Sequence, residues 1–158
     1  MVEDIRQGDI PGVQTRCRRR LPLKSSAAVW SWLVERKRLE SWLADEVAMQ
    51  GPGPDRLELR SGSNHDEVVE RATTLRIEEP RRWVFEFRRL NAGWTASTQL
   101  TFEISPDRGG FHLSVLHEGF QRLSLSMGLT VWEAYRERWR KALAALESAV
   151  RGAGAQGS

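Results

Sequence analysis

The amino-acid sequence predicts an α+β domain in which a curved antiparallel sheet of about six to seven strands wraps round one long C-terminal helix. Three observations predict this fold. Residues 130–150 repeat apolar side chains at helical spacing, residues 46–120 alternate apolar and polar side chains between turn signals, and two short helical segments rich in tryptophan precede them. The apolar stripe of the helix and the apolar face of the strands can be buried only against each other, which predicts a single shared core.

Length and composition favour one soluble domain. The chain has 158 residues and is 40% hydrophobic, which is enough to bury one sizeable core. A single cysteine, Cys17, excludes an internal disulfide and is typical of a reducing compartment, so we expect a cytoplasmic protein. No apolar run reaches the length of a membrane span, and the N-terminus lacks the pattern of a signal peptide.

The charge pattern argues against a nucleic-acid partner. The formal net charge is only +3, and the arginine runs at residues 18–20, 81–82 and 88–89 are mixed with acidic residues. These runs could contact phosphates, but no recognition helix, zinc finger or stacking sheet accompanies them. We therefore interpret them as solvated strand faces and turns.

Domain boundaries follow from periodicity. Residues 1–12 lack a repeating pattern and are expected to form a flexible leader, residues 13–151 a single domain, and residues 152–158 a disordered tail. No internal repeat and no second domain is indicated.

The first strand is predicted over residues 13–21. Alternation places five of its side chains on one face, namely Val13, Thr15, Cys17, Arg19 and Leu21. Ser25 or Ser26 is a typical N-cap for a helix over residues 27–37, and a second helix is predicted over residues 38–45. Because both helices are too short to be stable alone, we expect them to form a cap on the sheet.

Turn signals divide the next region into six strands. They are predicted at residues 46–50, 55–61, 67–79, 81–90, 95–105 and 110–120. In the third of these, the expected inner face consists of Val69, Thr73, Leu75 and Ile77. In the fourth, the apolar face consists of Trp83, Phe85 and Phe87, and in the last it consists of Phe111, Leu113, Val115 and His117. Consecutive hairpins of this kind predict an antiparallel meander.

The long helix is predicted over residues 130–150. Its buried stripe consists of Trp132, Tyr135, Trp139, Leu143, Leu146 and Val150. Thr130 and Glu133 have the spacing of a capping box at its start, and Gly152 is expected to end it.

Several short motifs, in this order and spacing, resemble a known family. They are Ala28-Val29-Trp30, Leu39, Trp42, residues 77–85, Gly110, Leu113, Val115, residues 117–120, Trp139, Leu143 and Leu146. Together they resemble the activator of heat-shock-protein-90 ATPase homologues, a branch of the START-like, birch-pollen-allergen-like helix-grip superfamily also called SRPBCC. The resemblance covers roughly residues 13–150 and implies a helix-grip fold. Arg138 stands where this family often has a glycine before the last-helix tryptophan.

Inward-facing aromatic residues provide the candidate ligand-binding site. Facing sheet and helix, they would line an apolar cleft in which His117 and the Tyr135 hydroxyl are polar anchors. The predicted ligand-binding residues are Trp83, Phe85, Phe87, Leu113, Val115, His117, Trp132, Tyr135 and Trp139. Two alternatives stay open: the same rings could fill the space as a solid core, and His117 could satisfy a buried backbone carbonyl.

Other chemistry has little support in the sequence. Three scattered histidines and one cysteine do not have the spacing of a metal site, and no phosphate-binding loop is present. Cys17 lacks an evident catalytic partner. We predict no catalytic residue, no metal and no cofactor.

The leading hypothesis is a non-catalytic module that binds an apolar small molecule or lipid-like ligand between sheet and C-terminal helix. The resemblance implies two alternatives, a co-chaperone-like partner of heat-shock protein 90 and a polyketide cyclase-like enzyme, for which His117 would be the candidate acid–base group. It also implies a bacterial protein with a role in the stress response. We expect a monomer or a weak homodimer.

Overall fold

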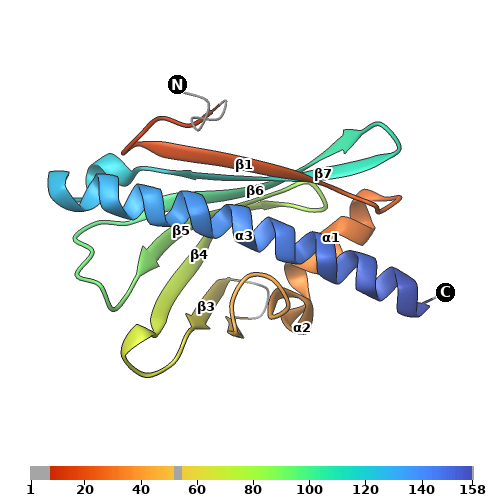
Figure 1. Cartoon of the computed structure of the whole chain (residues 1–158), viewed down its shortest axis with the longest axis horizontal. Coiled ribbons are helices and arrows are strands. Elements are labelled where there is room, and N and C mark those ends of the chain that lie inside the picture. Colours follow the sequence, from red (N-terminus) through yellow and green to blue (C-terminus); the bar gives the residue numbers. More distant parts are fainter. Residues whose placement is uncertain (1–7, 52–54, 158) are drawn as a thin grey trace.

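The computed structural model describes residues 8–51 and 55–157, and these form one sheet, one long helix and a small helical cap (Figure 1). The strands are β1 (Gln14–Leu21), β2 (Glu46–Gln50), β3 (Arg56–Ser61), β4 (Val68–Glu78), β5 (Arg82–Arg89), β6 (Thr98–Asp107) and β7 (Gly110–Glu118). The helices are α1 (Ser26–Val34), α2 (Arg36–Leu39) and α3 (Leu125–Gly157), with single 3₁₀ turns η1 (Asn64–Asp66) and η2 (Phe120–Arg122).

The seven strands form one sheet in the order β1-β7-β6-β5-β4-β3-β2. Every neighbouring pair is antiparallel. Figure 1 shows α3 lying across one face of this curved sheet, with α1 and α2 near its C-terminal half. The predicted fold, a curved antiparallel sheet around a C-terminal helix, is therefore confirmed.

The core lies between that face of the sheet and α3. Trp83, Phe85 and Phe87 of β5 are completely buried, as the alternation in the sequence predicts. They pack against rings of other elements; Phe85, for example, meets Phe102 of β6 edge to face at 5.6 Å between ring centres. Each fully buried side chain of this size contributes about 1.5–3 kcal/mol, so these rings contribute strongly to the stability of the domain.

The helical cap follows the prediction at its start and departs from it at its end. The Ser25 hydroxyl accepts a hydrogen bond from the Ala28 N–H at 3.1 Å, which makes Ser25 the N-cap of α1. α2 has only four residues, and Trp42 lies beyond it in a turn. Trp42 is nevertheless buried, because its indole N–H donates to the Trp32 carbonyl at 3.1 Å and fixes the turn to α1.

The predicted inner face of β4 is wrong. Leu75 and Ile77 are 57% and 41% exposed, whereas Glu70 and Ala72 are 1% exposed. The pairing of Ala72 with Phe87 sets this face, and an irregularity between Thr74 and Arg76 shifts the register beyond it. The prediction failed because it placed apolar side chains inside, while the inner face of this strand carries a carboxylate.

Helix α3 is longer than predicted at both ends. It begins at Leu125, and Thr130 lies inside it, where its hydroxyl donates to the Ser126 carbonyl at 3.4 Å instead of capping the helix. The helix also continues through Gly152 to Gly157, so the prediction that Gly152 ends it is wrong. Gly152 lacks the positive φ of a C-capping glycine, and a glycine inside a helix costs only about 1 kcal/mol. The residues predicted as a disordered tail are thus helical up to residue 157, and Ser158 lies outside the described residues.

The predicted leader falls partly outside the described residues, which begin at Gly8. Asp9 is buried, and its carboxylate accepts hydrogen bonds from the Thr15 hydroxyl at 2.9 Å and from Arg136 of α3 at 3.1 Å. This part of the chain is therefore tied to both β1 and α3. Among the described helices, none is long and apolar enough to cross a membrane.

Candidate functional site

The sequence-predicted site residues form a packed cluster. All nine are buried, and four of them meet around one point, where the Phe87 ring lies 5.0 Å from His117, 5.6 Å from Tyr135 and 6.2 Å from Trp139 between ring centres. Trp83 and Phe85 continue this cluster along β5, at 4.5 Å from each other. Leu113 and Val115 of β7 are completely buried, and the Trp132 indole N–H donates to the Gln14 carbonyl at 2.7 Å.

His117 has a hydrogen-bond partner at each ring nitrogen. The Trp139 indole N–H donates to Nδ1 at 3.0 Å, so the ring proton of the neutral imidazole is on Nε2, which lies 2.6 Å from the Thr98 hydroxyl oxygen. The Thr98 hydroxyl in turn donates to the Phe87 carbonyl at 3.3 Å. Burial lowers the pKa of His117 well below its usual range, and the positive charge of Arg138 lowers it further. His117 is therefore a neutral group that links β6, β7 and α3 through hydrogen bonds.

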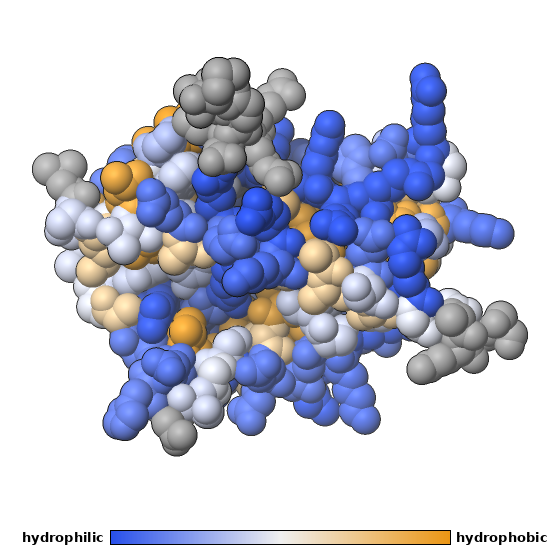
Figure 2. Space-filling model, in the orientation of Figure 1, coloured by the Kyte–Doolittle hydropathy of each residue, from blue (hydrophilic) through white to orange (hydrophobic). Residues whose placement is uncertain are grey.

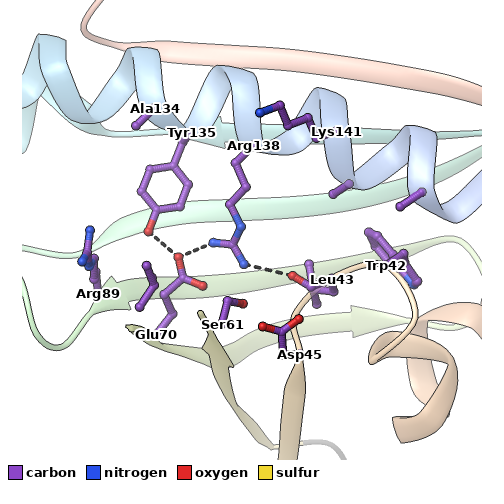
Figure 3. A pocket seen from close by; sticks show the side chains of 13 residues that line it. Trp42, Leu43, Asp45, Ser61, Glu70, Arg89, Ala134, Tyr135, Arg138 and Lys141 are labelled. Atoms are coloured by element: carbon purple, nitrogen blue, oxygen red, sulfur yellow. Dashed lines mark hydrogen bonds and ion pairs between the residues drawn. The ribbon is translucent and has the colours of Figure 1, made fainter. Parts of the chain in front are cut away.

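A cavity of about 580 Å³ opens beside this cluster, between α3 and the part of the sheet formed by β3, β4 and β5 (Figure 3). Its lining consists of Trp42, Leu43, Asp45, Ser61, Val68, Glu70, Arg89, Ala134, Tyr135, Arg138, Lys141, Ala142 and Ala145. Of the nine predicted ligand-binding residues, Tyr135 is the one that lines this cavity. The other eight are buried in the core, and ring contacts among Trp83, Phe85, Phe87, His117 and Trp139 occupy space in which a cleft was predicted.

Glu70, Tyr135 and Arg138 form a polar cluster in the wall of the cavity, which we call the Glu70 cluster (Figure 3). One carboxylate oxygen of Glu70, Oε2, accepts hydrogen bonds from both the Tyr135 hydroxyl and Arg138 Nη1. Arg138 Nη2 donates to the Leu43 carbonyl at 3.1 Å, so its guanidinium joins α3 to β4 and to the turn after α2. Burial raises the pKa of Tyr135 well above its usual range, and the negative charge of Glu70 raises it further, so the hydroxyl stays a donor.

Glu70 and Arg138 are not among the predicted site residues, and Arg138 was noted only as a departure from the family pattern. Arg138 lies three residues after Tyr135 on α3, a spacing that places the two side chains on one face of the helix. For Glu70, the available signal was the alternation of β4 counted back from Ala72. The predicted inner face followed the apolar Leu75 and Ile77 instead, which places Glu70 on the opposite face.

The rest of the cavity lining combines apolar and charged side chains, which suits an amphipathic ligand. Trp42, Val68 and three alanines of α3 supply apolar wall, and the charged residues Asp45, Arg89 and Lys141 also contribute to the lining. Such a combination of apolar surface and a few polar groups is typical of small-molecule sites. From the side of α3, the outer surface is mainly hydrophilic with small, separate apolar patches (Figure 2).

A metal centre has no support in the residues that the structure describes. No group of three or more histidine, cysteine, aspartate or glutamate side chains there is arranged to hold an ion. Cys17 is buried in β1.

Comparison with known proteins gives a family and a fold. The family model described as "Activator of Hsp90 ATPase homolog 1-like protein" matches residues 25–151. No curated protein sequence matches the chain.

Solved structures are similar to this chain in fold. Protein Ms6760 from Mycobacterium smegmatis is similar with a TM-score of 0.71, at 11% identity over 89% of this chain and 92% of that one. Protein CV1439 from Chromobacterium violaceum has a TM-score of 0.68, at 18% identity over 87% and 96% of the two chains. The Aha1 dimer from Colwellia psychrerythraea has a TM-score of 0.66, at 12% identity over 87% and 96%.

Proposed function

This chain belongs to the family of Activator of Hsp90 ATPase homolog 1-like proteins, and on that premise we propose that it is a non-catalytic module that binds an apolar small molecule or lipid-like ligand between its sheet and its C-terminal helix. The observation that carries this proposal is the cavity of about 580 Å³ beside α3. Its volume falls in the range of small-molecule sites, and its wall combines apolar side chains with a few fixed polar groups.

A binding role is favoured over a cyclase-like reaction by the state of His117. Both of its ring nitrogens are engaged by Thr98 and Trp139, and burial keeps it neutral. A general acid or base needs a free nitrogen within reach of the substrate. The hydrogen bonds of His117 leave it none.

Binding of a small molecule is also favoured over a co-chaperone-like role. All seven tryptophans are buried, so the aromatic clusters that commonly anchor protein interfaces do not lie on the surface. The exposed large apolar side chains are aliphatic, among them Leu75 and Ile77 on the outside of β4. We further propose that the protein acts in the cytoplasm, as a monomer or a weak homodimer.

The test is to fill the cavity from its helical wall. Ala145 is exposed at the cavity, so Ala145→Phe would place a ring there without disturbing the core. A panel of neutral naphthalene derivatives and medium-chain alcohols is titrated into the ¹⁵N-labelled protein, and amide shifts are followed. We expect shifts at α3, β3 and β4, and at least a tenfold loss of affinity in Ala145→Phe.

The matched control is Ser148→Phe, an exposed position on α3 outside the cavity lining, which should bind as the wild type does. If no compound of the panel binds, or if Ala145→Phe binds as tightly as Ser148→Phe, the cavity is not the site and the proposal is wrong.

A further inference from the structure

The two carboxylate oxygens of Glu70 are not used equally. Oε2 accepts from both Tyr135 and Arg138, whereas Oε1 has no hydrogen-bond partner among the described residues. Both oxygens belong to a side chain that is 1% exposed. Buried polar atoms in folded proteins are almost always paired, so an unpaired carboxylate oxygen calls for a specific explanation.

The unpaired oxygen belongs to a side chain in the wall of the cavity. Glu70 lines the cavity from β4, opposite Leu59 of β3 in the register. Ser61, two residues after Leu59, lines it from the same face of β3 and is the diagonal neighbour of Glu70. Figure 3 shows both side chains directed into the space below α3. A group that enters between them would meet a carboxylate acceptor on one side and a hydroxyl on the other.

We infer that the ligand carries a hydrogen-bond donor, which it gives to Glu70 Oε1. This inference rests on the proposed function and narrows the ligand class to apolar compounds with a neutral hydroxyl or N–H group. A carboxylate accepts hydrogen bonds and cannot donate them, so an ether or a ketone in the same place would leave Oε1 unpaired. A hydroxyl can donate to Oε1 and also accept from Ser61.

The charges around the cavity select a neutral donor over a cationic one. The negative charge of Glu70 is already matched by Arg138 in the same cluster. The lining adds Arg89 and Lys141 against the single carboxylate of Asp45. An ammonium group would therefore meet a net positive wall, whereas an alcohol or phenol keeps the hydrogen bond without that repulsion.

The experiment compares two probes with the same ring system, of which only one carries a hydrogen-bond donor. 2-Naphthol carries a hydroxyl, and 2-methoxynaphthalene has the same ring system with the hydrogen replaced by methyl. Isothermal titration of the wild-type chain should give at least tenfold tighter binding of 2-naphthol. A hydrogen bond to a charged acceptor accounts for a preference of this size.

A variant assigns the preference to Glu70. In Glu70→Gln, the amide carbonyl can accept from Tyr135 and Arg138, which places the NH₂ group where Oε1 was, so an acceptor becomes a donor. We expect the preference for 2-naphthol to fall to threefold or less, while 2-methoxynaphthalene binds at least as well as before. Glu86→Gln, an exposed change on β5, is the matched control and should keep the full preference.

The outcomes separate this inference from the proposed function. If both probes bind the wild type equally, or if Glu70→Gln keeps the tenfold preference, the donor inference is wrong and the binding function stands. If neither probe nor any compound of the wider panel binds, both fail together. Should Glu70→Gln not fold, equal binding of the two probes to the wild type still overturns the inference, and a tenfold preference for 2-naphthol supports it.

Discussion

Arg138 should be a costly charged residue to remove. Glu70 is 1% exposed and Arg138 is 23% exposed, so cutting the guanidinium leaves a carboxylate buried without its counter-charge. Removing one partner of a buried ion pair typically costs about 3–5 kcal/mol. Because water reaches part of the Arg138 side chain, we expect a cost below that range, and Arg138→Met should lower the free energy of unfolding by about 2–3 kcal/mol. Methionine keeps an apolar stem of similar length, but it removes the guanidinium that lies 4.8 Å from the centre of the Trp139 ring, so the loss includes this contact.

The assay is urea unfolding followed by far-UV circular dichroism, with the same substitution two residues on as its control. Arg140 pairs with Glu137 at 2.5 Å, but both side chains are 47% exposed, so Arg140→Met should cost less than about 1 kcal/mol. The double variant Glu70→Gln/Arg138→Met removes both charges and should recover about half of the loss or more. If Arg138→Met lowers the free energy of unfolding no more than Arg140→Met does, the ion pair of Glu70 and Arg138 contributes no more than an exposed one, and the prediction is wrong.

Two further predictions concern His117 and the glycines of α3. His117 has a lowered pKa in the folded state, so the unfolded chain binds its proton first, and stability should fall as the pH drops below the ordinary value of 6.5. Between pH 6.5 and 5.5 the wild type should lose about 1 kcal/mol more than His117→Gln, which has no such proton; parallel pH profiles from urea titrations would contradict this. At Gly128 an added Cβ would lie 2.9 Å from the Phe120 carbonyl oxygen, whereas at Gly152 it would meet nothing within 4 Å. Gly128→Ala should therefore lower the melting temperature and Gly152→Ala should raise it slightly, since alanine gains up to about 1 kcal/mol over glycine in a helix; equal shifts would refute the steric argument.

The sequence predicted the fold because the elements with the strongest periodicity are also those that bury most. Along β5, Trp83, Phe85 and Phe87 alternate with more exposed residues, and no other register could bury all three. The six side chains of the predicted stripe on α3 are likewise all buried. In both elements the local pattern and the tertiary packing favour the same arrangement, so the pattern alone is sufficient.

The prediction failed where a buried face is polar or where a signal is weak. On β4 the apolar Leu75 and Ile77 are outside, because the pairing with β5 turns Glu70 and Ala72 inward. The register of this pairing depends on β5, so the residues of β4 alone do not determine which face of the strand is buried. The end of α3 was misplaced for a different reason, since Gly152 permits a helix end without requiring one.

The location of the cavity follows from the sizes of neighbouring side chains on α3. One stripe carries Trp132, Trp139 and Leu143, which fill the space against the sheet. The stripe beside it carries alanines at 134, 142 and 145, with Arg138 between them, and these face β3 and β4 across the cavity. Small side chains leave volume there, and Arg138 closes part of it by reaching Glu70. The stripe of alanines on α3 can be read from the sequence. The volume that it leaves depends on the strand it faces, which is β4, and the sequence did not predict that Glu70 lies on the inner face of β4.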